Sequence, residues 1–408
     1  MSKQSLFTLA VHAGERSTET TPLSGVDAGR SYTPVVTPVH HSVGYTYEDA
    51  EDLDEVFAGA SDNPVYTRYG NPTVNAFEAA VASLEGGTAA LAYSSGMAAL
   101  HGALLAAGAR AGAAVVAAHD VYGATYALLD RLLASQGVIV RFVDVADPHA
   151  VSAALQELKP AALLAETVSN PLLKVADLPA LARLSREAGA AFIVDNTFAT
   201  PVLCRPLLLG ADYVVHSATK YLGGHGDVLG GVVAVGQPEM RRALNEVNKL
   251  LGANLAPQEA WLAHRGLKTL PLRVERQCRN AAIVAEWLNT RTEVVRVNYP
   301  GLTSHEQHAL ATSLFGGALY GGMISFDLAG AGRAEVFRFM EALRLIQPAT
   351  TLGDVYTLVL YPAMSSHRAL DPETRRRIGI GDGLVRLSVG IEDPEDIILD
   401  LKQALSVL

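Results

Sequence analysis

Residues 213–235 read YVVHSATKYLGGHGDVLGGVVAV. Two short apolar runs, Tyr213–Val215 and Gly231–Val235, flank a loop in which Lys220 stands among Ser, Thr and Ala and precedes a glycine-rich stretch. Apolar runs of this length, bounded by glycine and polar residues, are typical of buried strands. The segment therefore predicts two core strands and a loop that presents one lysine at their edge.

Five more apolar runs of strand length precede this segment, and longer helical patterns separate them. Between the last two of these runs, residues 177–188 repeat apolar residues at helical spacing, and Gly189 follows as a stop signal. Strands that alternate with helices predict an α/β fold with a mainly parallel central sheet. The five runs are Ala89–Tyr93, Ala113–Ala117, Val138–Val143, Ala162–Ala165 and Ala191–Val194.

The chain of 408 residues is long enough for two or three domains, at about 150 residues each. We expect an N-terminal arm over residues 1–62, where polar, proline and glycine residues show little periodicity. A large domain is expected over residues 63–257. A smaller C-terminal α+β domain is expected over residues 258–408, beginning with a long helical stretch from Gln258 to Leu288.

The composition excludes several classes of function. Hydrophobic residues make up 49% and charged residues 18% of the chain, which is typical of a globular protein and not of a disordered one. The net charge of −10 provides no basic footprint for nucleic acid or an anionic membrane. Cys204 and Cys278 form no CxxC pair, so neither a disulfide framework nor a zinc site is expected. We expect a cytoplasmic protein without a signal peptide or membrane span.

Polar residues stand directly after three of the predicted strands. Glu166 and Asp195 each follow one strand, and His216-Ser217 follows Tyr213–Val215. The carboxyl ends of the strands in an open parallel sheet face the ligand crevice. These side chains are therefore expected along one rim, although each alone could be an ordinary polar residue that enters a loop.

Lys220 and Asp195 are the candidates for chemistry on this rim. A lysine that forms an imine with a carbonyl compound must be partly desolvated, which lowers its pKa, and the hydroxyls beside it could bind a phosphate. A buried carboxylate such as Asp195 requires a positive partner, and a pyridinium nitrogen is one. The alternatives are a solvated loop lysine and a helix N-cap ahead of Thr197.

Ser94-Ser95-Gly96-Met97 follows the strand Ala89–Tyr93 and precedes a helical pattern. Unpaired N–H groups and the positive end of the helix dipole make such a junction suited to an anion. Gly96 would let the backbone approach a phosphate closely. The alternative is an ordinary serine cap.

In this order the segments resemble the Cys/Met-metabolism family of pyridoxal 5'-phosphate (PLP) enzymes, the trans-sulfuration enzymes. That family includes cystathionine γ-synthase, cystathionine β- and γ-lyases, methionine γ-lyase and the O-acetylhomoserine sulfhydrylases. The resemblance covers nearly the whole chain and implies the type I PLP transferase fold. Its motifs are Val11–Glu15, Tyr66–Thr73, Ser94–Met97, Val121–Thr125, Glu166–Pro171, Val194–Thr197, His216–Lys220, Arg265–Leu270 and Leu384–Gly390.

The resemblance implies catalytic roles for two residues and a charge partner for the cofactor. PLP is held as an aldimine on Lys220, which later moves protons. Tyr122 stacks on the cofactor ring and helps to activate the substrate amine. Asp195 pairs with the ring nitrogen, so that the ring can accept electrons from the substrate Cα.

The resemblance also assigns the residues that bind the phosphate and the substrate. Asn170 lies near the ring hydroxyl and the substrate carboxylate, Thr351 lies near that carboxylate, and Arg386 binds it through two hydrogen bonds. The phosphate is held by the N–H groups of Gly96 and Met97 and by the side chains of Ser217 and Thr219.

The resemblance assigns Tyr66 and Arg68 to another subunit's site, where they contact the phosphate bound by the neighbouring subunit. The N-terminal arm would then complete a composite active site. This implies a homo-oligomer, expected as a dimer of dimers. The alternative for Arg68 is a surface ion pair.

The shared machinery does not choose among the reactions of the family, so the departures must. Thr350 stands where many cystathionine γ-enzymes carry a glutamate, and Gly353-Asp354 looks more like methionine γ-lyases and sulfhydrylases. Ala124 stands where methionine γ-lyases often have cysteine, and Tyr361–His367 departs from the common His-Pro-Ala-Ser-Met-Thr-His run. We expect γ-elimination on a sulfur amino acid such as cystathionine or methionine. The alternatives are a γ-replacement synthase (cystathionine γ-synthase or an O-acylhomoserine sulfhydrylase) and, after it, cystathionine β-lyase.

Three other interpretations are disfavoured. Residues 224–230 loosely imitate a dinucleotide fingerprint, but the spacing is off by one and the run does not follow directly from a strand. His305 and His308 stand at helical spacing without further ligands nearby, so we expect a helix start and no metal site. A binding module without catalysis is disfavoured because Lys220, Asp195 and Arg386 are all present.

Overall fold

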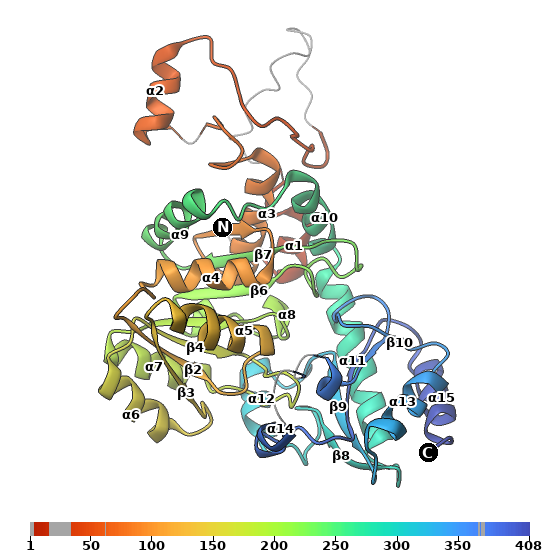
Figure 1. Ribbon diagram of the computed structural model, residues 1–408. Coiled ribbons are helices and arrows are strands. Elements are labelled where there is room, and N and C mark those ends of the chain that lie inside the picture. Colours follow the sequence, from red (N-terminus) through yellow and green to blue (C-terminus); the bar gives the residue numbers. More distant parts are fainter. Residues whose placement is uncertain (1–3, 16–33, 62, 366–367, 369–371) are drawn as a thin grey trace.

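Seven strands form the central sheet of the computed structural model, which describes residues 4–15, 34–61, 63–365, 368 and 372–408. They lie in the order β1-β7-β6-β5-β4-β2-β3 (Figure 1). Of these strands, β7 alone runs antiparallel to each of its neighbours, so the predicted mainly parallel sheet is confirmed. The strands are β1 (Ala89–Tyr93), β2 (Ala114–Ala118), β3 (Ile139–Val143), β4 (Ala162–Glu166), β5 (Ala191–Asp195), β6 (Tyr213–Ser217) and β7 (Gly231–Val235).

All seven strands coincide with the apolar runs that predicted them. The largest difference is at β6, which continues to Ser217 and so includes the polar pair expected to follow it. Along β5, Phe192 and Val194 belong to one hydrophobic cluster and Ile193 to another. This alternation shows that both faces of the sheet are covered, as in other parallel sheets.

Helices cover the two faces of the central sheet. The predicted helix over residues 177–188 is α7, with the side chain of Asp177 as its N-cap and Gly189 as its left-handed C-cap. The cluster on one face draws on α3 (Pro72–Glu85), α6 (Pro148–Leu158) and α7 (Leu178–Ala188). The cluster on the other face draws on α4 (Gly96–Ala106), η1 (Leu128–Leu133) and α9 (Pro238–Leu251). Short helices between the strands are α5 (Gly123–Ala127), α8 (Thr200–Leu203) and η2 (Pro206–Leu209).

A second, smaller sheet forms towards the C-terminus, in the order β10-β11-β12-β9-β8 (Figure 1, lower right). It has its own hydrophobic cluster, in which Val385 and Leu387 are packed with Ile397 and Leu401 of the last helix. The predicted smaller α+β unit is therefore present. Its elements are β8 (Val294–Asn298), α12 (His308–Phe315), β9 (Met323–Leu328), α13 (Arg333–Ala342), β10 (Gln347–Pro348), β11 (Leu358–Leu360), η3 (Pro362–Met364), α14 (Pro372–Arg377), β12 (Leu384–Ser388) and α15 (Pro394–Leu405).

The long helical stretch predicted up to Leu288 is two helices, α10 (Pro257–Leu267) and α11 (Leu270–Leu288). Pro271 lies in the first turn of α11, where its missing N–H and its ring prevent an unbroken helix from passing through it. Arg273 bridges the break, because it donates to the carbonyl oxygens of Tyr221 and Gly266 over 2.8 Å each. The start of α11 is thereby fixed to the loop that carries Lys220.

The N-terminal residues contain two short helices that the sequence pattern did not predict. α1 (Leu6–His12) packs on the body of the chain through Ala10, which is buried in the cluster that includes α3. α2 (Ala50–Ala58) buries none of its residues and stands apart from the body in Figure 1. Residues 1–3, 16–33 and 62 of the expected arm lie outside the described residues. Among the helices that are described, none is both long and apolar enough to span a membrane.

Candidate active site

The polar ends of three neighbouring strands meet at one rim of the central sheet, as predicted. Glu166 ends β4 and Asp195 ends β5, and the two residues are direct partners in the parallel ladder. Ser217 ends β6, which pairs with β5. Successive side chains on a strand point to opposite faces, so Ser217 and His216 serve different sides of the sheet.

Lys220 lies in the turn after β6, where its carbonyl oxygen accepts the Gly224 N–H over 2.8 Å. Its side chain is partly buried, and its Nζ donates to Thr351 Oγ1 over 3.0 Å. Burial lowers the pKa of Lys220, Arg386 lowers it further, and Asp354 opposes the shift. The alternative of a solvated loop lysine is therefore wrong, and this amine loses its proton more readily than a surface lysine.

Thr351 reaches Lys220 because a C-terminal turn packs directly on the lysine loop. Gly353 has a φ of +77°, and a Cβ added to it would lie 2.7 Å from the Tyr221 backbone nitrogen. Glycine is therefore required there both by conformation and by space. Beyond the turn, the Val355 N–H donates to the Gly224 carbonyl oxygen over 3.0 Å. The lysine loop and the turn from Thr351 to Val355 are thus joined by hydrogen bonds at both ends.

Asp195 presents a partly buried carboxylate at the end of β5. Burial raises the pKa of Asp195, while two hydrogen bonds from Thr197 and the nearby His216 oppose the rise. Its Oδ1 accepts the Thr197 N–H over 2.9 Å. The alternative of a helix N-cap is wrong, because α8 begins only at Thr200. A cation placed against this carboxylate would restore its ionised form.

The N-terminus of α4 forms an anion cradle beside Ser217. Gly96 and Met97 are the first two residues of α4, and Ser95 caps the helix by accepting the Ala98 N–H over 3.1 Å. The N–H groups of a first turn have no partner inside the helix. A Cβ on Gly96 would lie 2.7 Å from Ser217 Cβ, so only glycine permits this approach. The helix end and the strand end thus lie together at the place where the sequence predicts an anion site.

Thr219 is engaged more closely with the backbone than the sequence indicated. Its Oγ1 donates to the Gly230 carbonyl oxygen over 3.2 Å and accepts the Gly230 N–H over 3.0 Å. Its single O–H is thus taken by this carbonyl oxygen, and it must turn away from Gly230 before it can donate to an anion. The pairing also closes the glycine-rich loop, so Thr219 has a structural role that does not depend on a ligand.

Arg386 and Asn170 form the buried cationic part of the site. Arg386 donates from Nη1 to Asn170 Oδ1 over 3.0 Å and from Nη2 to the Thr351 carbonyl oxygen over 3.4 Å. Among the described residues, its buried Nε has no partner. Burial lowers the pKa of Arg386 to about 10. A buried guanidinium with unused donors is suited to a carboxylate.

Tyr122 stands at the edge of the site with 41% of its surface exposed, and it caps α5. Its N–H donates to Glu166 Oε1 over 2.7 Å. Burial raises the pKa of Glu166 well above its usual range, and Asp195 and Asp120 add to the rise. Glu166 therefore fixes the start of α5 through the Tyr122 N–H.

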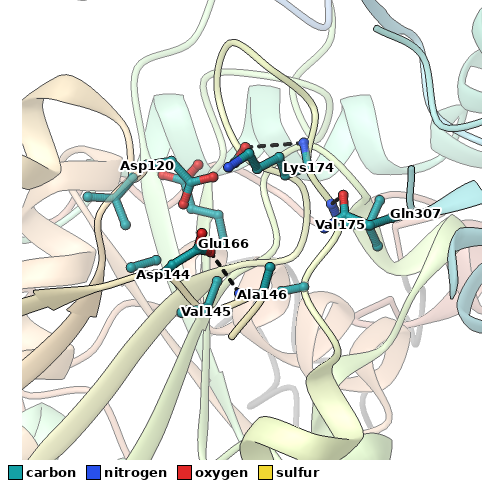
Figure 2. A pocket seen from close by; sticks show the side chains of 12 residues that line it. Asp120, Asp144, Val145, Ala146, Glu166, Lys174, Val175 and Gln307 are labelled. Atoms are coloured by element: carbon teal, nitrogen blue, oxygen red, sulfur yellow. Dashed lines mark hydrogen bonds between the residues drawn. The ribbon is translucent and has the colours of Figure 1, made fainter. Parts of the chain in front are cut away.

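Figure 2 shows a small pocket beside Glu166, lined also by Asp120, Asp144, Lys174 and Gln307. Gln307 reaches across from the C-terminal part and accepts the Val175 N–H over 3.0 Å. Within the part of the chain that the structure describes, no group of three or more acidic, His or Cys side chains could hold a metal ion. This pocket therefore receives no metal assignment.

Tyr66 and Arg68 contact each other, and Arg68 also contacts the end of α9 and the segment that follows it. Arg68 donates to the Lys249 carbonyl oxygen over 2.7 Å and packs over the Tyr69 ring at 4.8 Å. Tyr66 is 41% exposed. Arg68 is held by a carbonyl oxygen and aromatic rings, and none of the ion pairs among the described residues includes it.

The residues gathered here fit PLP. The cradle at Gly96 and Ser217 suits its phosphate, the partly buried carboxylate of Asp195 suits its ring nitrogen, and the amine of Lys220 lies at the same rim. Two further expectations from the sequence concern residues 224–230 and the start of a helix near His308. Residues 224–230 lie in a loop that opens no helix, so they are not a dinucleotide fingerprint. α12 begins at His308, as expected.

Sequence reasoning gave no role to two buried acids near the rim, Asp354 and Glu85. The charge of Asp354 interacts with that of Lys220, and Glu85 contacts His216 on the other face of the sheet. The alternation of side chains along a strand could have indicated such an acid. It places His216 on the face opposite Ser217, where a buried histidine needs a polar partner. Ser366 and His367, in the altered run from Tyr361, lie outside the described residues.

Comparison with known proteins gives consistent matches over the whole chain. A family model described as "Cys/Met metabolism PLP-dependent enzyme" matches residues 9–406. The L-methionine gamma-lyase of Pseudomonas putida is 44% identical over 375 residues, which cover 91% of this chain and 92% of the relative. A cystathionine beta-lyase of Lactococcus lactis subsp. cremoris is 44% identical over 83% of this chain and 88% of the relative. The structure of cystathionine gamma synthase from Xanthomonas oryzae pv. oryzae matches with a TM-score of 0.88 and 36% identity, covering 99% of this chain and 98% of that one.

Proposed function

The chain belongs to the family of Cys/Met metabolism PLP-dependent enzymes, and on this premise we propose that it performs γ-elimination on a sulfur amino acid such as methionine or cystathionine. PLP-dependent γ-elimination or γ-replacement is the chemistry of this family. Elimination is our choice between the two. When bound, PLP supplies a ring that accepts the electrons released at the substrate Cα.

The observation that carries the proposal is that an amine and a guanidinium both bind Thr351. Lys220 Nζ binds the hydroxyl of Thr351, and Arg386 binds its carbonyl oxygen. An amino acid whose carboxylate binds Arg386 would therefore present its Cα within reach of Lys220. The pairing of a carboxylate anchor with a deprotonatable amine is what proton removal from the Cα requires.

The protein's own groups would divide the work as follows. Arg386 and Asn170 bind and orient the substrate carboxylate. Lys220 Nζ would hold the cofactor and would accept the proton that leaves the substrate Cα. Asp195 keeps the cofactor ring nitrogen protonated, and Tyr122 covers the ring and helps to deprotonate the substrate amine.

The phosphate of the cofactor would be bound by the α4 cradle described above. The helix N-terminus supplies N–H groups and a positive dipole, both favourable to a phosphate dianion. The Ser217 hydroxyl would add a donor, and the Thr219 hydroxyl would add a second one once its O–H turns from the Gly230 carbonyl oxygen to the phosphate. These groups would keep the phosphate in place independently of the lysine. The set comprises the N–H groups of Gly96 and Met97 and the side chains of Ser217 and Thr219.

Elimination at Cγ removes protons from Cα and Cβ and expels the sulfur as a thiol. Addition of water then releases a 2-oxo acid and ammonia, so methionine would yield methanethiol, 2-oxobutyrate and ammonia. Thr350 supports an uncharged thioether over cystathionine, because it replaces the glutamate that many cystathionine γ-enzymes carry. Thr351 keeps a hydroxyl against Lys220.

A substrate panel tests the proposal. Methionine, cystathionine, homocysteine, cysteine and O-acylhomoserines are incubated with the PLP-loaded enzyme, and 2-oxobutyrate, pyruvate and thioether products are all measured. We expect 2-oxobutyrate from methionine or cystathionine. Thioether formed from an O-acylhomoserine and a thiol, without 2-oxo acid, would assign a γ-replacement synthase. Pyruvate from cystathionine would assign β-cleavage.

We further propose a dimer of dimers in which Tyr66 and Arg68 reach the phosphate of a neighbouring subunit. The position of α2 supports this assembly, because the helix buries none of its residues and leaves Phe57 65% exposed. Exposed aromatic surface on a projecting helix is typical of a subunit contact.

The division into an arm over residues 1–62, a large domain over 63–257 and a C-terminal domain over 258–408 also remains a proposal. It is supported by the start of α10 at Pro257. The cytoplasm is the proposed location, supported by Cys204 and Cys278, both free thiols.

A further inference from the structure

A fully buried polar network lies under the active-site rim. Glu85 is the last residue of α3, and its Oε1 lies 2.6 Å from His216 Nε2. At most 1% of either side chain is exposed. Asn196 Nδ2 donates to the same carboxylate oxygen over 3.0 Å, and Asn196 Oδ1 accepts the Thr167 hydroxyl over 2.7 Å. One oxygen of Glu85 thus joins the ends of β5 and β6, and Thr167 adds the end of β4.

The two residues that Glu85 binds directly are each the chain neighbour of a proposed cofactor contact. Asn196 follows Asp195, the contact for the ring nitrogen, and His216 precedes Ser217, a contact for the phosphate. Above the sheet, Thr197 makes a second link between them, since its N–H donates to Asp195 Oδ1 and its Oγ1 accepts the Ser217 N–H, both over 2.9 Å.

The network is not arranged for stability alone. Within the described part of the chain, Glu85 Oε2 and His216 Nδ1 are buried without a partner. Buried ionisable pairs of this kind are often no more stable than apolar side chains of the same volume. Their desolvation cost therefore points to a role in placing neighbouring residues. His216 also favours the ionised form of Asp195, as noted above.

We propose that Glu85 is a positioning residue, which fixes the separation between the ring-nitrogen contact and the phosphate contact by holding Asn196 and His216. The inference rests on the roles of Asp195 and Ser217 in the proposed function. Glu85 acts from the opposite face of the sheet and only through its neighbours. Loss of its two hydrogen bonds would leave only the strand ladder and the Thr197 link between the two contacts, so their separation would be held less firmly and the cofactor would bind more weakly.

The test compares two glutamates of the same helix. Glu78, like Glu85, is buried on α3, but it binds the Ala92 N–H over 2.8 Å and Arg241, away from the rim. Each is replaced by methionine, which keeps the length and removes the hydrogen bonds. The apo-proteins are titrated with PLP, and the dissociation constant and the absorption and circular dichroism bands of the bound cofactor are recorded.

We expect Glu85→Met to weaken PLP binding at least tenfold and to change the circular dichroism of the bound cofactor, while Glu78→Met leaves both near wild type. Glu85→Gln keeps the acceptor oxygen, so it should retain most of the affinity. Equal effects of Glu78→Met and Glu85→Met, or wild-type affinity in Glu85→Met, would overturn the inference.

Two further variants keep the outcome decisive. If Glu85→Met does not fold, Thr167→Val removes one hydroxyl from the network with little change of shape, and wild-type binding and spectra in it would count against the idea. Asp195→Ala and Ser217→Ala test the proposed contacts themselves. If neither weakens PLP binding, the proposed roles fail; if both do and Glu85→Met does not, only the positioning role fails.

Discussion

Lys220 Nζ lies 3.0 Å from Thr351 Oγ1, although 131 positions separate the two residues in the chain. This contact brings the loop after β6 against the turn before β11. The turn belongs to the C-terminal part of the chain, and the lysine to the central sheet. The reacting amine is therefore positioned by both sheets, and several predictions test what each side contributes to it.

Replacement of Lys220 by Ala should leave the fold intact and remove turnover. The side chain is partly buried, and within the described residues its one side-chain hydrogen bond is to Thr351, so its loss costs little stability. The cofactor would lose its covalent anchor and the site its proton acceptor. Far-ultraviolet circular dichroism and the rate of 2-oxo acid formation measure the two effects. Near-normal turnover by Lys220→Ala would contradict the mechanism.

The pH dependence of cofactor uptake should respond in opposite directions to two charge changes near Lys220. The amine must be deprotonated to react with the aldehyde, so uptake by the apo-protein rises as the pH passes through the pKa of Lys220. Arg386 lowers that pKa and Asp354 raises it. Arg386→Met should move the midpoint to higher pH, and Asp354→Asn should move it to lower pH. Stopped-flow absorbance across a pH series measures the midpoints, and a shift in the same direction for both variants would contradict the assignment.

Arg386→Lys should reduce kcat/KM at least tenfold. Lysine keeps the positive charge but cannot form two parallel hydrogen bonds with a carboxylate, and a charge-assisted bond is worth about 1.5–3 kcal/mol. Steady-state kinetics with methionine and cystathionine measure the loss. An unchanged kcat/KM with both substrates would show that their carboxylates bind elsewhere.

Gly353→Ala should destabilise the protein and slow turnover. The positive φ costs about 1–2 kcal/mol for alanine, and the close approach to Tyr221 adds about 1–3 kcal/mol of steric cost. Gly252→Ala is the matched control, because Gly252 has a φ of +70° with nothing within 4 Å of the added Cβ. Thermal unfolding and kcat are measured for both variants. The control should lose stability only, and equal kcat values for the two would separate the Thr351 turn from catalysis.

Activity should be restored when inactive Arg68→Ala and Arg386→Ala chains are mixed. If Arg68 serves the neighbouring subunit, a mixed dimer contains one site with both arginines intact. Random pairing should then give about a quarter of wild-type activity. The mixture is refolded or exchanged together before assay, and each variant refolded alone is the control. A mixture that never exceeds the separate variants would contradict the shared site.

The sequence by itself determined the strands, the rim and the residues that stand on it. Each of these signals is local: apolar runs set β5 and β6, and the polar residues that end them fall at the carboxyl rim because parallel strands share a direction. Short helices such as α2 gave no such signal, because a segment of so few turns repeats the helical spacing of apolar residues too few times to be recognised. The helical stretch predicted up to Leu288 is present as two helices, because Pro271 interrupts it.

The tertiary structure alone decided which distant side chains meet. Arg386 binds Asn170 across 216 positions, and Glu85 binds His216 across 131. Such pairs depend on how the two sheets pack and on which face a helix presents, and no short-range period encodes either. The motif residues could thus be recognised one by one, while the lowered pKa of Lys220 and the buried support beneath the rim arise from burial and proximity, which exist only in the folded chain.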